Sequence, residues 1–132
     1  MTPERTDRCP FCEPDRGPKV VERCGTVVAI ADKNPVTKGH MLILPVRHTP
    51  DYFAMTPEEK KDADRLIRIL RDRIEASDAT VTGFNIGVNC GTSAGQTIMH
   101  AHIHFIPRRD GDVPQPRGGV RGVIPDQQAY AD

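Results

Sequence analysis

The stretch Gly95-Gln-Thr-Ile-Met-His-Ala-His-Ile-His-Phe-Ile-Pro107 holds three of the five histidines of the chain, at every second position. Because side chains alternate between the faces of a β-strand, this spacing predicts a strand with all three imidazoles on one face, roughly 6.6 Å apart. The histidines are His100, His102 and His104, and the opposite, buried face would carry Met99, Ala101, Ile103 and Phe105. Pro107 is expected to end the strand, because proline cannot donate a ladder hydrogen bond.

Three neighbouring imidazoles point to chemistry that needs more than one protonation state. Adjacent rings resist being cationic together, so their protonation states are driven apart, as a site with a nucleophile and a proton donor requires. Near neutral pH, histidine is the side chain that serves in both roles. The spacing alone leaves two other interpretations open, a polyhistidine metal site and an exposed polar strand face.

Several pieces of the sequence together resemble the histidine triad (HIT) family. The run His-Ala-His-Ile-His-Phe-Ile is similar to its alternating motif, and Ala94-Gly-Gln-Thr97 to the turn before that motif. Upstream, Asp32-Lys-Asn-Pro35 and Gly39-His-Met-Leu-Ile-Leu-Pro45 resemble its first substrate-facing strands. The resemblance spans roughly residues 20–107. It implies an α+β fold with an antiparallel sheet of about five strands, one long helix and a short N-terminal helix or turn.

The composition favours one compact domain. A chain of 132 residues builds a modest core, helped by a partner subunit or a metal. Eighteen basic and eighteen acidic residues give zero net charge, so no global field attracts a nucleic acid or an anionic membrane, which leaves room for a small local anion site. The polar N-terminus lacks the apolar core of a secretory signal, and no apolar run reaches the length of a membrane span. A cytoplasmic protein is therefore expected.

The pair Cys9-Pro-Phe-Cys12 is the first feature with chemical content. In a protein without an export signal, this spacing favours metal binding or redox chemistry over a disulfide. A redox pair would lie between a strand and a helix, whereas this pair opens the chain. Half of a tetrahedral zinc site needs two distant ligands, and the HIT resemblance implies that His48 and His100 supply them to a structural Zn²⁺. A metal-free pair of thiols, with Phe11 merely packing, is the alternative.

The HIT resemblance implies a nucleotide pocket. Phe11, Ile30 and Leu42 would line an apolar slot for the base, and Asp32 would accept hydrogen bonds from the ribose. The loop of small residues that ends at Gly95 would cradle a phosphate. Further contacts with the phosphate or ribose would come from Asn89, Gln96 and Thr97. For Asp32, capping of the turn at Asn34-Pro35 is the alternative.

The same resemblance implies nucleotidyl transfer through a covalent histidine intermediate. His102 would attack an α-phosphorus as a neutral ring, while its other nitrogen is hydrogen-bonded to the backbone carbonyl of His100. His104 would contact the phosphoryl oxygen or the leaving group and stabilise charge there. His40 would support the triad as a hydrogen-bond partner, unless it is a purely structural histidine.

A histidine at the third motif position matches the hydrolases of the family, since its transferases have glutamine there. The expected function is a nucleotide hydrolase that acts on the α-phosphate of a dinucleoside polyphosphate or a nucleoside phosphoramidate. The cysteine pair and the Arg-Gly tail favour the dinucleoside polyphosphate. The alternatives are a purine nucleotide-binding regulatory protein with incidental catalysis, a nucleotidyltransferase or phosphorylase, and a metal-binding domain without a reaction. The family also implies a twofold homodimer.

The other elements are read from periodicity. Residues 20–32 predict two strands broken near Gly25, and residues 41–45 a short central strand. Thr56-Pro-Glu-Glu59 is a capping box that starts a scaffold helix. Its apolar face would comprise Ala63, Leu66, Ile67, Leu70 and Ile74. Residues 81–89 alternate, which places Phe84, Ile86 and Val88 inward and Asn85, Gly87 and Asn89 outward.

The HIT domain would therefore cover residues 1–107, including the cysteine pair. Residues 108–132, rich in glycine, proline and arginine, are called the tail here. A disordered tail is one interpretation. The other is a tail packed on the domain, anchored by Val120, Val123 and Ile124, with Arg117 and Arg121 reaching a polyphosphate.

Overall fold

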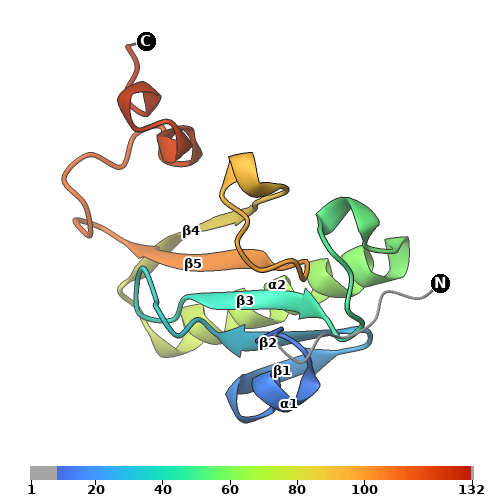
Figure 1. Ribbon diagram of the computed structural model, residues 1–132. Helices are drawn as coiled ribbons and strands as arrows, with labels where there is room; N and C mark the ends of the chain where they lie inside the picture. The colour runs from blue at the N-terminus through green and yellow to red at the C-terminus, as the bar shows by residue number, and fades with distance from the viewer. Residues whose placement is uncertain (1–8, 132) are drawn as a thin grey trace.

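The computed structural model describes residues 9–131 and has an α+β fold, in which one long helix covers a five-stranded antiparallel sheet (Figure 1). The strand order is β1-β2-β3-β5-β4. The strands are β1 (Val20–Cys24), β2 (Val27–Ala31), β3 (Met41–Pro45), β4 (Val81–Val88) and β5 (Ile103–Arg109). The helices are α1 (Glu13–Arg16) and α2 (Pro57–Ser77), and the 3₁₀ turns are Gly17–Lys19, Tyr52–Ala54, Thr92–Ala94, Gly119–Val123 and Pro125–Gln127.

Helix α2 begins at the predicted capping box. The Thr56 hydroxyl accepts a hydrogen bond from the Glu59 amide at 3.1 Å, and the Glu59 carboxylate accepts one from the Thr56 amide at 2.8 Å. Ala63, Leu66 and Leu70 are buried against the sheet. The helix thus closes one face of the sheet and leaves the other face for the N-terminal segment.

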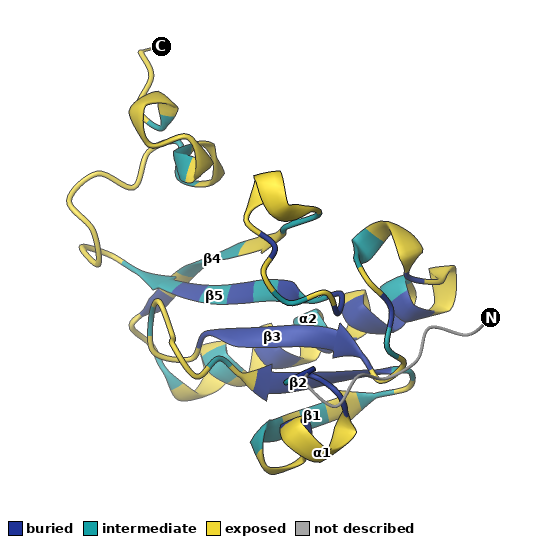
Figure 2. Cartoon of the chain, viewed as in Figure 1, coloured by how far each residue is buried: buried dark blue, intermediate teal, exposed yellow. Residues whose placement is uncertain are grey.

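Strand β3 is buried on both faces and separates two apolar clusters (Figure 2). Its residue Ile43 packs in the cluster beneath α2, whereas Leu42 and Leu44 point to the opposite face. There they meet Phe11 and the cysteine pair of the N-terminal segment. A single strand therefore supplies both the core and the floor of the candidate site.

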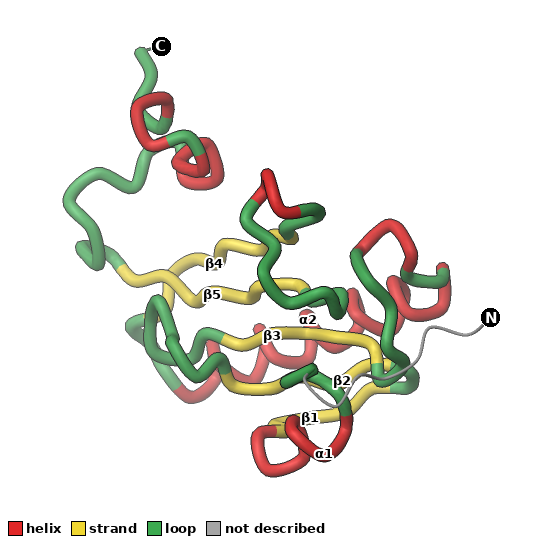
Figure 3. Tube along the Cα trace, viewed as in Figure 1, coloured by secondary structure: helices red, strands yellow, loops and turns green. Residues whose placement is uncertain are grey.

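The predicted strand bounds around the triad are wrong at both ends. Strand β5 begins only at Ile103, so His100 and His102 lie in the extended loop that leads into it (Figure 3). Met99 is 44% exposed instead of buried, because it lies in that loop. The strand also continues through Pro107 to Arg109.

Pro107 is tolerated inside β5 because its position needs no donor. Pairing with β3 ends at Phe105, and the Pro107 carbonyl accepts a hydrogen bond from the Thr37 hydroxyl at 2.7 Å. The amide and carbonyl of one strand residue face the same side, so the missing N–H lies where the β3 ladder has already ended.

Strand β4 does not bury the predicted apolar face. Phe84 stacks on Phe105, with ring centroids 5.0 Å apart, but Ile86 is 48% and Val88 37% exposed. The reason is topological, since β4 is an edge strand and α2 packs mainly on β1, β2 and β3. Alternation predicts which side chains share a face, but it does not predict whether anything covers that face.

The tail folds into two 3₁₀ turns beyond β5 (Figure 1). The predicted apolar anchors are largely exposed: Val120, Val123 and Ile124 are 64%, 75% and 59% exposed, although the first two line a hollow together with β4 residues. The Gln128 side chain instead donates to the backbone carbonyls of Gln115 and Arg117, each at 3.4 Å.

The predicted role of the tail arginines also differs from their placement. The guanidiniums of Arg117 and Arg121 lie over the Tyr130 ring, 4.5 and 4.9 Å from its centroid. Across residues 9–131, no helix has the length and apolar character that a membrane span requires.

Candidate functional site

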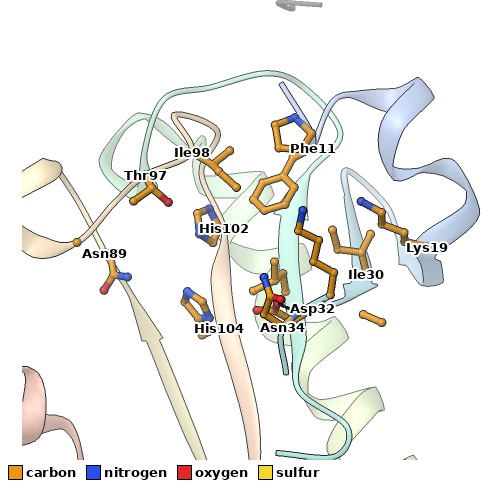
Figure 4. A pocket seen from close by; sticks show the side chains of 15 residues that line it. Phe11, Lys19, Ile30, Asp32, Asn34, Asn89, Thr97, Ile98, His102 and His104 are labelled. Carbon is orange, nitrogen blue, oxygen red and sulfur yellow. Dashed lines mark hydrogen bonds between the residues drawn. The ribbon is translucent and has the colours of Figure 1, made fainter. Parts of the chain in front are cut away.

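A cavity of about 280 Å³ opens on the face of the sheet opposite α2 (Figure 4). One wall carries Phe11, Ile30 and Leu42, with Asp32 beside them, and the other carries His102 and His104. Seven of the eight predicted substrate-binding residues line it: Phe11, Ile30, Asp32, Leu42, Asn89, Gly95 and Thr97. The topology brings these residues together from the N-terminal segment, β2 and the turn after it, β3, and the loops on either side of the 3₁₀ turn Thr92–Ala94.

Gln96 is the exception among the predicted substrate contacts. Its side chain is buried and does not line the cavity within the described structure. The amide oxygen accepts a hydrogen bond from the Gly91 amide at 2.9 Å, and the amide nitrogen donates to the Pro50 carbonyl at 2.7 Å and the Ile98 carbonyl at 3.1 Å. Gln96 therefore shapes the loop, and this arrangement does not support a direct phosphate contact.

The cavity also contains residues that the sequence analysis missed. Lys33 and Asn34 follow Asp32 directly, and Lys19 approaches from the turn before β1. Adjacency to Asp32 was a usable signal for the first two, since a turn that places one side chain at a rim places its neighbours there. No local signal marks Lys19.

The orientation of His102 is set by one hydrogen bond. Its Nδ1 lies 2.8 Å from the backbone carbonyl of His100, which can only accept, so the proton resides on Nδ1. Nε2 then keeps its lone pair on the cavity side of the ring. The Phe11 ring contacts His102 edge to face, with centroids 5.0 Å apart, and limits its rotation.

A second chain of hydrogen bonds orients His104. The Val36 amide donates to His40 Nδ1 at 3.0 Å, so a neutral His40 carries its proton on Nε2. That nitrogen lies 3.0 Å from His104 Nδ1 and 3.4 Å from an Asp32 carboxylate oxygen. His104 Nδ1 is consequently an acceptor, and its Nε2 proton remains available to a ligand. His40 is thus buried between the ribose-side carboxylate and the triad.

Burial keeps His40 and His104 neutral. It lowers the pKa of His40 more than the Asp32 carboxylate raises it, so their contact joins a neutral ring to a carboxylate. Burial also lowers the pKa of His104, and the charges of His102 and His40 lower it further. Both rings are therefore neutral at neutral pH, and each carries its single proton on Nε2, from which it can donate a hydrogen bond.

These shifts predict the outcome of a histidine NMR titration. We expect the ring carbon signals of His40 and His104 to titrate below pH 6.5, because burial disfavours the cationic form in the folded protein. The unfolded chain takes up these protons first, so the free energy of unfolding should fall as the pH drops below about 6.5. A midpoint at or above 6.5 for either ring would contradict the relay.

A separate cluster joins Cys9, Cys12, His48 and His100, whose candidate ligand atoms all lie within 4.8 Å of one another. Cys9 Sγ is 3.6 Å from His100 Nδ1, and Cys12 Sγ is 3.4 Å from His48 Nδ1. A tetrahedral Zn²⁺ at about 2.3 Å from sulfur and about 2.0 Å from nitrogen would separate such pairs by about 3.5 Å.

The hydrogen bonding of His100 also suits a metal ligand. Its Nε2 lies 2.9 Å from the Pro45 carbonyl and so carries the proton, which leaves the Nδ1 lone pair facing the thiols. Burial lowers the pKa of His100 to about 4, so the ring is neutral, as ligation requires. The four predicted ligands are thus brought together with the right donor atoms and the right tautomer.

A second group of possible ligands, Asp32, His40 and His104, does not have this property, although its ligand atoms are equally close. The Val36 amide occupies the lone pair of His40 Nδ1, so Nε2 must hold the proton. A metal on Nε2 would leave the ring with no proton at all, contrary to the usual second-shell donation by histidine ligands. This group is a hydrogen-bond relay.

The fold and the site together define a domain in which two of three alternating histidines, His102 and His104, line a cavity, while the first, His100, lies in the cysteine cluster. A family model described as the HIT domain matches residues 16–111, and the chain belongs to the HIT family. An uncharacterized HIT-like protein of Mycobacterium tuberculosis is 36% identical over 129 residues, which cover 92% of this chain and 86% of that protein.

Several relatives carry names of activities. A bis(5'-nucleosyl)-tetraphosphatase (asymmetrical) of Schizosaccharomyces pombe is 34% identical over 73% of this chain and 52% of its own length. An adenylylsulfatase of Arabidopsis thaliana is 34% identical over 79% of this chain and 54% of its own length.

Solved structures agree with the fold. A HIT family protein from Bacillus anthracis superposes with a TM-score of 0.72 at 31% identity, over 97% of this chain and 82% of that one. A zinc-bound histidine triad protein from Mycobacterium smegmatis gives 0.71 at 30% identity, over 81% and 77%.

Proposed function

We propose that this protein is a nucleotidyl hydrolase that works through a covalent intermediate on His102. The observation that carries the proposal is the hydrogen bond from His102 Nδ1 to the His100 carbonyl. It holds the ring in the tautomer whose Nε2 lone pair faces the cavity, and a neutral imidazole in that state is a nucleophile.

The proposed reaction has two displacements at the α-phosphorus. In the first, His102 Nε2 forms an N–P bond while the bond from phosphorus to the leaving group breaks, and the leaving group keeps the electron pair and takes a proton from solvent. In the second, water attacks phosphorus, the N–P bond breaks, and the water proton passes to solvent. The sum is one water consumed, with a nucleoside monophosphate and the protonated leaving group released. The His104 Nε2 proton would donate to a phosphoryl oxygen in both steps.

The cavity supports a nucleotide as the substrate. Phe11, Ile30 and Leu42 offer an apolar slot for a base, and Asp32 lies between that slot and the histidines, where a ribose would fall. The relatives with named activities are called a tetraphosphatase of bis-nucleosyl compounds and an adenylylsulfatase, and each name describes action on a nucleotide. A third relative, at 32% identity, is named AP-4-A phosphorylase, so a transferase or phosphorylase remains the second candidate.

Trapping the intermediate tests this proposal. We expect adenosine 5′-phosphoramidate or diadenosine tetraphosphate, labelled at the α-phosphate, to leave label on the protein after a rapid quench. A phosphorus–nitrogen bond predicts that this label is acid-labile and alkali-stable, and peptide mapping should place it on His102. Product formed in ¹⁸O-water should carry one ¹⁸O in the monophosphate. Turnover with no protein-bound label, or label on another residue, would contradict the covalent route.

We also propose that Cys9, Cys12, His48 and His100 hold a structural Zn²⁺. The ion, with four protein ligands and no open position, would supply folding energy and no reaction chemistry. It would fasten the segment that carries Phe11 to the loop before the triad, and so set one wall of the cavity.

A homodimer and a cytoplasmic location stay predictions. The dimer is supported by the unpaired edge of β4 and its half-exposed Ile86, which adjoins α2 residues such as Ile67.

A further inference from the structure

A larger hollow adjoins the nucleotide cavity. It has a volume of about 580 Å³ and lies between the β4–β5 surface and the tail. His104 and Asn89 line both spaces, so the two adjoin at the phosphate end of the candidate site. Figure 4 shows Asn89 across the cavity from Phe11 and Ile30, with His102 and His104 between them. The hollow, called the β4 groove here, thus lies on the side away from the base slot.

The lining of the β4 groove is apolar and nearly uncharged. Its walls include Val36 and Ile106 from the domain, with Val113, Val120 and Val123 from the tail. Its described lining residues include two basic side chains, the neutral His104 and Arg108, and the Arg108 guanidinium binds the Asp112 carboxylate with two contacts of 2.8 Å. The Arg108–Asp112 ion pair therefore neutralises the only permanent charge on the described groove surface.

This composition does not suit a polyphosphate chain. Phosphates are bound in proteins by unneutralised arginines and lysines or by clustered backbone amides. Arg117 and Arg121, which were predicted to reach a polyphosphate, lie over Tyr130, and among the described residues neither lines the groove or the nucleotide cavity. An extended anion leaving His104 would therefore enter a space without a compensating cation.

We propose that the β4 groove binds the leaving group of the substrate and selects an uncharged, apolar one. The inference rests on the proposed function and specifies its substrate class, a nucleoside monophosphate joined at the α-phosphate to an apolar group. In-line displacement puts the leaving group opposite the nucleophile. With the base between Phe11 and Ile30 and the phosphorus beside His102, the bond that breaks points toward His104, Asn89 and the groove. The leaving group departs with the electron pair and is protonated by solvent, as in the general scheme.

Two substrates that differ only in the leaving group measure this selection. They are adenosine 5′-phosphoramidate, which releases ammonia, and its N-(2-phenylethyl) derivative, which releases an apolar amine. We expect the full-length protein to favour the phenylethyl compound in kcat/KM by about tenfold or more, because its leaving group is removed from water in the groove. Diadenosine tetraphosphate should be turned over less efficiently than the phenylethyl compound.

Charge placed on the groove wall should remove this preference. Val120→Asp and Val123→Asp should each lower the ratio of kcat/KM for the phenylethyl compound over the parent by about tenfold, since a carboxylate on the wall keeps water beside it and disfavours an apolar group there. Ile124→Asp is the matched control: Ile124 lies in the same tail and is similarly exposed, but it is not among the described lining residues of the groove. It should leave the ratio unchanged.

The outcomes separate the groove from the chemistry. No hydrolysis of either phosphoramidate by the wild type would overturn the proposed function and this inference together. Hydrolysis with equal ratios in wild type, both valine variants and the control would overturn the groove alone. Light scattering on the same samples tests whether a second copy of the chain fills the groove instead. If the valine variants change the oligomeric state without changing the kcat/KM ratio, the groove is an interface between copies and the inference is wrong.

Discussion

Replacing His102 with alanine is expected to reduce kcat by on the order of 10⁴-fold or more while the protein still binds a nucleoside monophosphate. The loss should be this large because the ring is the proposed nucleophile, and the relay through His40 and His104 stabilises charge without forming a bond to phosphorus. The base slot and Asp32 are untouched, so the affinity for AMP measured by calorimetry should change by less than about tenfold. Turnover is measured with adenosine 5′-phosphoramidate by chromatography of the product.

The control for this variant is a neighbour that lines the same cavity without an ionisable group. Ile98 is such a residue, and Ile98→Ala should retain kcat within about fivefold. If His102→Ala kept a tenth or more of wild-type turnover, His102 would not be the nucleophile. If the wild type bound AMP but turned over no substrate, the regulatory alternative would be favoured over an enzyme.

The sequence correctly predicted those helix and strand boundaries that depend only on residues close together in the chain. The capping box at Thr56 and Glu59 fixes the start of α2 through two reciprocal hydrogen bonds, and both partners are three residues apart. The break between β1 and β2 is equally local, since Gly25 has a φ of +56°, a backbone conformation that favours glycine.

Predictions were wrong where the structure depends on what lies opposite a segment. Alternation correctly grouped Phe84, Ile86 and Val88 on one face, but the edge position of β4 leaves the last two uncovered. Likewise, Pro107 breaks a strand only if a partner needs its amide, and the end of the β3 ladder at Phe105 removes that need.

The candidate site also combines features that the sequence predicts with features that depend on groups from other segments. The residues that come together could be predicted from the motif resemblance, including the four candidate metal ligands, which are up to 91 residues apart in sequence. The tautomer of His102 was predicted, because the resemblance implied its hydrogen bond to the His100 carbonyl. The tautomers of His40 and His100 could not be predicted, because they depend on the Val36 amide and the Pro45 carbonyl. Those two contacts are what separate a relay histidine from a ligand histidine in this fold.

Removing zinc is expected to lower the melting temperature of the protein by on the order of 10 °C, because an ion that binds only the folded state stabilises it by mass action. The purified protein should contain about one zinc per chain. Without the ion, the N-terminal segment would be held to the triad loop by Cys9–His100 and Cys12–His48 contacts of 3.6 and 3.4 Å, which are weak as thiol–imidazole hydrogen bonds. Phe11 would then lose its fixed place in the base slot.

Single-cysteine variants separate the metal site from a general effect of losing a thiol. Cys12→Ser should lower both the zinc content and the melting temperature, and a chelator should then have little further effect. Cys90→Ser is the control, because Cys90 is half-buried in a loop and belongs to neither ligand group. Ligation needs deprotonated thiols and a neutral His48, so zinc retention should decline as the pH is lowered. A protein that contains no zinc after purification without chelator, and whose melting temperature is the same with and without added Zn²⁺, would show that the four side chains pack together without binding a metal.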